Sequence, residues 1–378
     1  MLSVSILSLC LWVFLLLFRG AYWRILFLPT TEARPCDRPS NVAVVIPARD
    51  EVATIATTLH SLFSQKIQGK LHIFLVDDHS TDGTAEAARQ EAKRTNRLSL
   101  LTILNGKPLP NGWTGKLWAV RQGLDAAYQI NPDFMLLTDA DITHAPDNLH
   151  HLISHAQQEN VDLTSLMVKL NCDIFAERAL IPAFVYFFFM LYPQRWIAKP
   201  NARTAGAAGG CMLVRPSALK RIGGIDAIRN ALIDDCSLAA AIKKTGGRVH
   251  LFATRTTTSS RRYTGFGEIW NMIARTAFTQ LHYSFFLLLF TLLALALIFM
   301  APPWAALYGH GWTHSVGLAT WILMALSFQP VLRLYNQNGL WGFALPLIAL
   351  FYASATIGSA LRFWLGRGGQ WKGRAQAP

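Results

Sequence analysis

Pairs of carboxylates directly follow two apolar stretches of this chain, and their types and spacing suit ligand chemistry. Asp77 and Asp78 close the segment LHIFLVDD, and Asp139 and Asp141 close the segment FMLLTDAD. On an extended segment the side chains of residues i and i+2 project to the same side, so Asp139 and Asp141 can hold one cation together. Ligation by oxygen alone, with open positions, suits Mg²⁺ or Mn²⁺. This spacing therefore suits a divalent metal site.

The apolar runs before these acids predict buried strands of an α/β fold. A further run begins at Val42 and is stopped by Pro47, after which comes charge and then a helical pattern. The apolar positions of that helix are Val52, Ile55, Leu59, Leu62 and Phe63. Ligands bind at the carboxyl ends of the strands in parallel α/β sheets, because loops and helix N-termini converge there. We therefore expect three strands to deliver acids to one edge of a sheet.

Aspartates lie at the starts of two predicted helices, where each could have a structural role or a chemical one. Asp82 precedes Gly83 and Thr84, and it is interpreted either as a helix cap or as a ligand. Asp234 and Asp235 open the helical segment CSLAAAIKKTG, where a simple cap is again one interpretation. The other is acid-base chemistry, since a buried carboxylate beside a hydroxyl can take its proton, typically contributing ~10² to 10⁴ in rate.

Taken in order, the segments PARDE, LVDDxSxDGT and DAD resemble the nucleotide-sugar half of an inverting family 2 glycosyltransferase. The resemblance extends to Gly209-Gly210 and Asp234-Asp235, so it covers most of residues 40–282. Together with the membrane segments described below, the chain most resembles the hopanoid-biosynthesis-associated branch of that family, and more distantly the ceramide glucosyltransferases. The resemblance implies a GT-A nucleotide-sugar-binding domain with a Rossmann-like mixed sheet over residues 42–282.

The resemblance also implies a role for each matching residue. One of Asp77 and Asp78 would read the uracil ring of a UDP-sugar, and Asp139 and Asp141 would be the metal ligands. Asp235 would be the catalytic base, the second acid of its pair, with Asp234 in support. The further contacts to the nucleotide sugar would be Pro47, Ala48, Glu51, Lys116, Gly209, Gly210 and Arg275.

Two of these contacts carry an alternative. Lys116 lies in Gly115-Lys116-x-x-Ala119-x-x-x-Gly123, which resembles the GKxxAxxxG element beside the donor but also fits ordinary surface charge. The spacing is wrong for a Walker A loop. Arg275 aligns with the arginine of the QxxRW element of many membrane relatives, yet the flanking Gln and Trp are missing. The basic pair Arg261-Arg262 is a rival for its phosphate-binding role.

Composition and charge predict a membrane protein. Hydrophobic residues make up 52% and charged residues 15% of the 378 residues, against about 25% charged in soluble domains. The net charge is +13, and much of the basic charge lies close to apolar segments, as expected for the cytoplasmic side of a membrane. We find no motif for binding nucleic acid. The five cysteines form no CxxC pair, which argues against a zinc site or a disulfide framework and fits a reducing compartment.

The apolar segments predict a multi-pass protein of the inner (cytoplasmic) membrane with its catalytic domain in the cytoplasm. Residues 1–24 read as an uncleaved anchor, because a signal peptide would need a positive start and a small-residue cleavage site. A linker is expected over residues 25–41, and residues 180–197 read as an interfacial segment or a core helix. The region 283–378 carries two or three spans and a basic tail. If all three spans cross the membrane, the basic tail lies outside the cell, which contradicts the positive-inside tendency. Either the middle span is re-entrant, or this tendency does not hold here.

The predicted function is therefore inverting, metal-dependent sugar transfer from a nucleotide sugar to the hydroxyl of a membrane lipid at the cytoplasmic face. The resemblance points to a hopanoid or similar lipid as the acceptor. Three alternatives stay open: a processive polysaccharide synthase, a transferase that acts on a polyprenyl phosphate, and a catalytically inactive nucleotide-binding scaffold. An intact QxxRW element and more spans would be expected of the first, whereas the third fits poorly with intact DAD and DD segments.

Overall fold

The computed structural model describes residues 1–29, 38–366, 370–371 and 374–375, and these fall into two compact units. The helical unit comprises Met1–Ile25, Asn171–Arg195 and Arg262–Gly369, and the α/β unit comprises Leu26–Leu170, Trp196–Arg261 and Gln370–Pro378. Much of the expected linker 25–41, with Cys36, and most of the basic tail lie outside the described residues.

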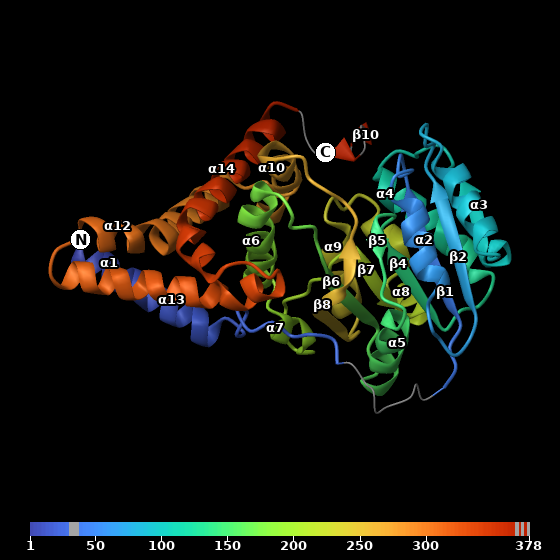
Figure 1. Ribbon diagram of the computed structural model, residues 1–378, viewed down its shortest axis with the longest axis horizontal. Coiled ribbons are helices and arrows are strands. Elements are labelled where there is room, and N and C mark those ends of the chain that lie inside the picture. Colours follow the sequence, from blue (N-terminus) through green and yellow to red (C-terminus); the bar gives the residue numbers. More distant parts are fainter. Residues whose placement is uncertain (30–37, 367–369, 372–373, 376–378) are drawn as a thin grey trace. The chain divides into compact units, whose positions relative to one another are not determined.

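An eight-stranded mixed sheet forms the core of the α/β unit, with the strand order β3-β2-β1-β4-β7-β6-β8-β5 (Figure 1). β1 is parallel to β2 and β4, β2 to β3, and β6 to β8. β7 runs antiparallel to β4 and β6, and β5 runs antiparallel to β8. This confirms the predicted mixed α/β sheet. The strands are β1 (Val42–Ala48), β2 (Leu71–Asp77), β3 (Leu101–Asn105), β4 (Phe134–Thr138), β5 (Ile142–Thr143), β6 (Leu163–Lys169), β7 (Cys211–Val214) and β8 (Val249–Ser259).

The predicted strands are there, and their apolar side chains are buried. All residues of β1 and β4 are buried, because both strands lie inside the sheet with neighbours on either side. Pro47, which we expected to end the first strand, lies within β1 beyond Val45, where the pairing with β4 ends. Its missing N–H therefore removes no bond to β4. A small antiparallel pair, β9 (Gln370–Trp371) and β10 (Arg374–Ala375), lies apart from this sheet.

Short helices connect the strands of the α/β unit (Figure 1). They are α2 (Ile55–Phe63), α3 (Thr84–Arg94), α4 (Gly115–Tyr128), α5 (Asn148–Gln158), α8 (Pro216–Arg221) and α9 (Asp234–Lys244). α7 (Gln194–Ala198) lies in the chain where the helical unit passes into the α/β unit. Four of the five apolar positions predicted for the first helix are correct, since Ile55, Leu59, Leu62 and Phe63 are buried against the sheet. The prediction is wrong for Val52, which is exposed and lies before the helix begins at Ile55.

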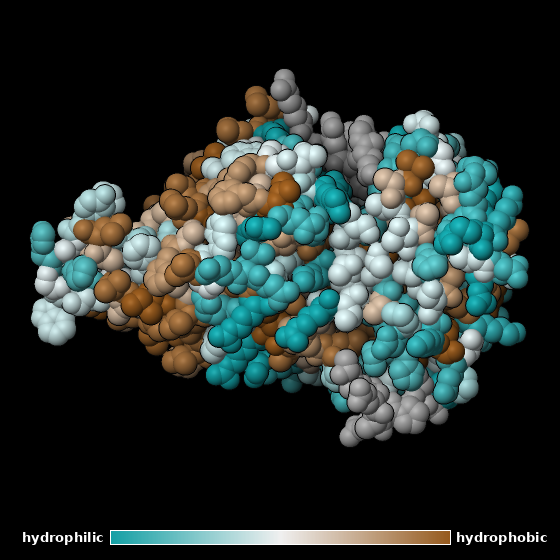
Figure 2. Space-filling view, in the orientation of Figure 1, coloured by the Kyte–Doolittle hydropathy of each residue, from teal (hydrophilic) through white to brown (hydrophobic). Residues whose placement is uncertain are grey.

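Among the described residues, four helices are long and apolar enough to cross a membrane: Phe175–Ala198, Phe285–Tyr308, Trp312–Leu334 and Gly339–Trp364. All belong to the helical unit except the last three residues of the first, which belong to the α/β unit. The elements of the helical unit are α1 (Leu2–Phe18), α6 (Phe175–Leu191), α10 (Phe266–Ala274), α11 (Phe285–Leu295), α12 (Ala301–Tyr308), α13 (Trp312–Leu334) and α14 (Leu345–Trp364), with a π-helical turn at Ala296–Met300 and a 3₁₀ helix, η5, at Gly339–Ala344. Hydrophobic residues gather on the surface of this unit in Figure 2, as expected for contact with lipid.

Two helices of this unit differ from the sequence expectation in length. The apolar stretch between Pro182 and Pro193 is short, but α6 begins at Phe175 and continues through Pro182 without ending. The middle C-terminal segment, expected to be short, is a helix of 23 residues. Length and composition alone would let both cross a bilayer.

Candidate active site

The loops that follow β1 and β2 are joined by hydrogen bonds at the edge of the sheet. Glu51 N–H donates to Thr84 Oγ1 at 2.8 Å, and Val52 N–H donates to Asp82 Oδ2 at 2.9 Å. The other carboxylate oxygen of Asp82 accepts from Thr84 N–H at 3.0 Å, and these bonds outweigh partial burial and lower the pKa of Asp82. Asp82 thus serves the local structure. The Glu51 side chain also bonds locally, accepting from Thr54 Oγ1 at 3.2 Å.

Asp77 and Asp78 lie side by side where β2 ends, in different surroundings. Asp78 is almost fully buried, and Arg49 Nη1 donates to its carbonyl at 2.7 Å and lies 3.6 Å from its carboxylate. The Asp77 carboxylate accepts from Ser80 N–H at 3.0 Å. Gly106 N–H donates to the Asp77 carbonyl at 2.8 Å, and a Cβ on Gly106 would lie only 3.0 Å from that oxygen. Sequence reasoning missed both Arg49 and Gly106, although Arg49 lies within the PARDE segment.

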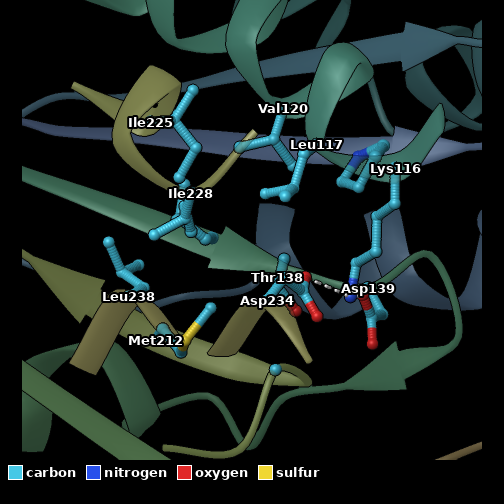
Figure 3. Close-up of a pocket in the computed structure, with 13 residues that line it drawn as sticks. Lys116, Leu117, Val120, Thr138, Asp139, Met212, Ile225, Ile228, Asp234 and Leu238 are labelled. Atoms are coloured by element: carbon cyan, nitrogen blue, oxygen red, sulfur yellow. Dashed lines mark ion pairs between the residues drawn. The ribbon is translucent and has the colours of Figure 1, made fainter. Parts of the chain in front are cut away.

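Lys116 joins two of the predicted acids (Figure 3). It lies in the first turn of α4, and its Nζ is 2.9 Å from Asp139 Oδ1 and 3.2 Å from Asp234 Oδ2. Burial alone would lower the pKa of Lys116, but the charges of Asp139, Asp234 and Asp235 outweigh it and raise that pKa. The lysine is therefore a permanent cation between the end of β4 and the start of α9, and not an ordinary surface charge.

Asp235 is held by two backbone N–H groups beside this lysine. Its Oδ2 accepts from Gly209 N–H at 2.8 Å, and its Oδ1 accepts from Cys236 N–H at 2.7 Å. A Cβ on Gly209 would lie 3.4 Å from both Asp235 Oδ2 and Lys116 Nζ. Burial, and then the charge of Asp234, raise the pKa of Asp235 to about 6, although Lys116 and the two N–H groups act in the other direction. A carboxylate of this kind is suited to accept a proton near neutral pH.

Asp139 and Asp141 follow the end of β4 at Thr138, where Ala140 and Asp141 form a turn and not the extended segment that the spacing argument assumed. Asp141 Oδ2 accepts from Ser259 Oγ at 2.8 Å. Removal from bulk water raises the pKa of Asp139, and the charge of Asp141 acts in the same direction while Lys116 opposes both. Among the described residues, no group of three or more His, Cys, Asp or Glu side chains is placed to hold a metal ion.

The charges of the site nevertheless fit a divalent cation. Three carboxylates, those of Asp139, Asp234 and Asp235, act on one lysine, and Asp141 adds its charge beside Asp139, so the negative charge is only partly offset by the protein. Surplus negative charge in a partly buried site is unfavourable until a cation joins it. Asp139 and Asp141 can supply two oxygen ligands to such a cation, and the remaining positions would belong to water or to a bound diphosphate.

A buried network behind the site was not predicted. Thr138 Oγ1 lies 2.7 Å from the Gly210 carbonyl and 3.1 Å from His144 Nε2, and His144 Nδ1 lies 3.1 Å from Asn148 Nδ2. Burial lowers the pKa of His144 to about 3, so the ring is neutral. The Thr138 hydroxyl then donates to Gly210 and accepts from His144, which accepts in turn from Asn148. This chain fixes Gly210 against the end of β4.

A pocket opens beside Lys116, lined by apolar side chains on one side and charges on the other (Figure 3). Leu117 and Val120 from α4 line the apolar side, and Pro47 and Gly209 also face it. Of the other predicted contacts, Ala48 accepts from Asp78 N–H at 2.8 Å through its carbonyl. Arg275 belongs to the helical unit, where it follows α10 as its C-cap residue.

Comparison with known proteins gives one family match. Residues 43–223 match the model of the family described as "Glycosyl transferase family 2". The chain is 29% identical over 147 residues to a 4,4'-diaponeurosporenoate glycosyltransferase of Staphylococcus haemolyticus, which covers 38% of this chain and 36% of the relative. It is 27% identical over 120 residues to an undecaprenyl-phosphate 4-deoxy-4-formamido-L-arabinose transferase of Photorhabdus laumondii, which covers 31% and 34%. The chain thus spans about a third of the length of these relatives.

A solved structure extends the likeness to nearly the whole chain. A mannosyltransferase of Pyrobaculum calidifontis, in complex with GDP-Man and Mn²⁺, has a TM-score of 0.57 and 17% sequence identity, covering 97% of this chain and 99% of that one. At this identity the likeness shows a shared fold.

Proposed function

We propose that this enzyme transfers a sugar from a nucleotide-diphosphate donor to a hydroxyl of a membrane lipid. The premise is that residues 43–223 are a family 2 glycosyltransferase domain of GT-A fold. One constellation carries the proposal: Lys116 between Asp139 and Asp234, with Asp235 held beside Gly209. It places a cation, candidate metal ligands and a candidate base within one cluster.

The donor would bind along the sheet edge where β1, β2 and β4 end. Its base would lie near Asp77 and Asp78, which the resemblance assigns to uracil, so that a UDP-sugar is the proposed donor. Asp139 and Asp141 would hold Mn²⁺ or Mg²⁺, which would neutralise charge on the diphosphate. Lys116 is placed to stabilise the charge that develops on the leaving group.

Asp235 would take the proton from the acceptor hydroxyl, whose oxygen then attacks the anomeric carbon as the bond to the diphosphate breaks. A pKa of about 6 leaves this carboxylate ionised at neutral pH yet basic enough to accept a proton. A single displacement of this kind inverts the anomeric configuration. Asp234 would act in support, by holding Lys116 at 3.2 Å.

The acceptor is proposed on other grounds. The helical unit offers apolar surface to a bilayer, which suits an amphiphile whose hydroxyl lies at the depth of the lipid headgroups. The motif resemblance points to a hopanoid. The basic residues beside the apolar segments support an inner-membrane enzyme whose active site faces the cytoplasm. Fold alone does not fix the substrate.

A polyprenyl phosphate is the second candidate acceptor. The similarity to an undecaprenyl-phosphate transferase favours it. Such an acceptor is already anionic, so it would need no base. The environment of Asp235 therefore favours a hydroxyl acceptor, and the two candidates predict opposite results when this carboxylate is removed.

The test is release of nucleotide by the full chain, purified in detergent, from a panel of UDP- and GDP-sugars with Mn²⁺ or Mg²⁺ and a bacterial lipid extract. We expect release that depends on metal and lipid, and that Asp139→Ala and Asp235→Asn abolish. The exposed Asp147 provides the control variant Asp147→Asn, which should stay active. Activity retained by Asp235→Asn would support the phosphate acceptor. Donor binding without turnover under every condition would contradict the proposal and favour an inactive scaffold.

A further inference from the structure

We propose that the helical unit crosses the bilayer three times, through α1, through α11 with α12, and through α13, and that α6 and α14 lie at one membrane face without crossing. The apolar surface of the helical unit thus contacts a lipid bilayer, in which the unit has one defined orientation. The supporting contacts all lie within the helical unit, so they stand whether or not the proposed function is correct.

One crossing pair is the hairpin of α12 and α13. Residues 276–332 contain no Asp, Glu, Lys or Arg. The aromatic residues Trp304, Tyr308 and Trp312 flank the turn of this hairpin and are more than half exposed. Such side chains prefer the interface between membrane and water. The 23 residues of α13 are about 35 Å long, enough for a hydrocarbon core of about 30 Å. We call the end with this turn the distal end, and the end with residues 262–284 the proximal end.

α1 crosses beside this hairpin. Trp12 Nε1 donates to the Ile298 carbonyl at 2.8 Å, and Ser8 Oγ donates to the Leu297 carbonyl at 2.9 Å. Pro302 has no N–H, so the Ile298 carbonyl lacks its usual helical donor. In hydrocarbon such a carbonyl must find another partner, and Trp12 supplies it. α1 is therefore hydrogen-bonded to the middle of the span from Phe285 to Tyr308.

α14 ends where α11 begins. Phe363 stacks on Tyr283 with ring centroids 4.4 Å apart, and Phe278 N–H donates to Ser359 Oγ at 3.1 Å. Arg362 donates to Asn271 Oδ1 at 2.7 Å. The last turns of α14 thus lie against α10 and the residues before α11, at the proximal end.

The segment that leads into α14 also comes from the proximal side. α13 reaches that side at Leu334, and η5 then runs back along α13. Gln329 Nε2 donates to the Gly339 carbonyl at 2.9 Å, and Trp321 Nε1 donates to the Phe343 carbonyl at 3.2 Å. The chain therefore dips part of the way toward the distal end, and α14 brings it back. Residues 335–364 enter and leave at the same face.

α6 touches proximal segments at both of its ends. At its start, the Phe175 ring lies 6.2 Å from that of Phe266 in α10. Just past its end, Tyr192 Oη donates to Gln280 Oε1 at 2.7 Å. Its middle meets α13 through Tyr186, whose hydroxyl lies 2.6 Å from Ser327 Oγ. In Figure 1, α6 runs across the direction of α13 and not along it. A helix so placed lies in the plane of the membrane.

The basic residues of the helical unit agree with this topology. Arg19 follows α1, Arg275 follows α10, and Arg333 and Arg362 lie in the last turns of α13 and α14. All four lie at the proximal end, which the positive-inside tendency assigns to the cytoplasm. Between residues 25 and 262 the chain passes between the two units four times, at 25–26, 170–171, 195–196 and 261–262. With three crossings the basic tail stays on the same side, because the last apolar segment, and not the middle one, is re-entrant.

The test is sided labelling of single cysteines in the full chain. Cys10, Cys36, Cys172, Cys211 and Cys236 are replaced by Ser, and one exposed position at a time becomes Cys: His310, Asn336, Leu365, Asp173 or Arg195. A membrane-impermeant maleimide is applied to intact cells and to inside-out vesicles. We expect His310→Cys to react at least tenfold faster from outside, and the other four from inside. If Leu365→Cys and His310→Cys react from the same side, the placement of α14 is overturned. If Asp173→Cys and Arg195→Cys react from opposite sides, the placement of α6 is overturned.

A second measurement covers the case in which the cysteine-free chain does not fold. A green fluorescent protein is fused after Pro378 of the unaltered chain, and the control carries a known one-span segment between the two. Three crossings predict a fluorescent fusion and a dark control. A dark fusion with a fluorescent control would overturn the proposal.

Discussion

The two units of this chain treat polar groups away from water in opposite ways. In the α/β unit, three carboxylates share one lysine, and the pKa values of Asp139 and Asp235 are raised. In the helical unit, the buried acid Glu177 is matched with hydrogen-bond donors. Glu177 is buried and accepts from the N–H groups of Asp173 and Tyr263, at 2.8 and 2.9 Å.

The difference separates function from structure. A matched polar group in a buried place holds elements together and requires nothing further. A cluster with surplus charge costs stability in the free protein and is useful only when a cation or a proton joins it. From this comparison we propose that the helical unit is the scaffold and that the cluster around Lys116 is the chemical site.

The largest effect should come from Asp235→Asn, which removes the candidate base but keeps its size. We expect the rate of transfer to a lipid hydroxyl to fall by about 10² to 10⁴, with little change in donor affinity. Turnover by product analysis and donor binding by calorimetry would check this, with Asp147→Asn as control. A loss confined to donor affinity would make Asp235 a binding residue.

Lys116→Met should weaken donor binding by about 10- to 100-fold, because a cation that faces the diphosphate is lost. It should also raise the pKa of Asp235, since the positive charge beside that carboxylate disappears. The acid limb of the pH profile would then move to higher pH. The control is Lys107→Met, at an exposed position of the same unit. If the acid limb does not move, the charge of Lys116 does not act on the pKa of Asp235.

The unaltered enzyme should lose activity in acid. The base must be ionised, and its pKa is raised to about 6. The ratio kcat/KM, which reports the free enzyme, should be constant above that pH and fall about tenfold per unit below it. A profile flat down to pH 4.5, at which the protein is still folded, would contradict the assignment of the base.

The smallest effect on chemistry should come from Trp12→Phe in the helical unit. It leaves the Ile298 carbonyl without its donor, which costs about 1 to 3 kcal/mol of stability. Thermal unfolding in detergent should shift down by several degrees while kcat stays the same. Trp304→Phe, at an exposed position, should change neither quantity. A changed kcat in Trp12→Phe would mean that the scaffold and the site are not separable.

Much of the α/β unit could be predicted from sequence because its signals are local. Apolar runs ending in acids gave β1, β2 and β4, and the mixed α/β sheet is confirmed. The hydrogen bond from Gly209 to Asp235 and the chain from Gly210 to Asn148 could not be predicted. They depend on β7 entering antiparallel beside β4, which brings residues 26 to 72 positions apart into contact. The roles of the site residues remain predictions.

The helical unit was harder to predict because hydropathy gives the length of an apolar helix but not its direction relative to the membrane. The apolar residues of α14 would suit a crossing, yet Phe363 returns to Tyr283. Pro182 indicated a boundary, but α6 passes through it because tertiary packing around Tyr186 holds the helix together. Such pairings between distant segments have no local signature.

The bond from Trp12 to Ile298 also bears on biosynthesis. Its two partners are 286 residues apart in the chain. At about 5 to 20 residues per second, the ribosome needs tens of seconds between them. On the proposed topology, α1 stands in the membrane during that interval with an indole N–H whose Ile298 partner has not yet been made. The anchor is made first, but its final place is set among the last.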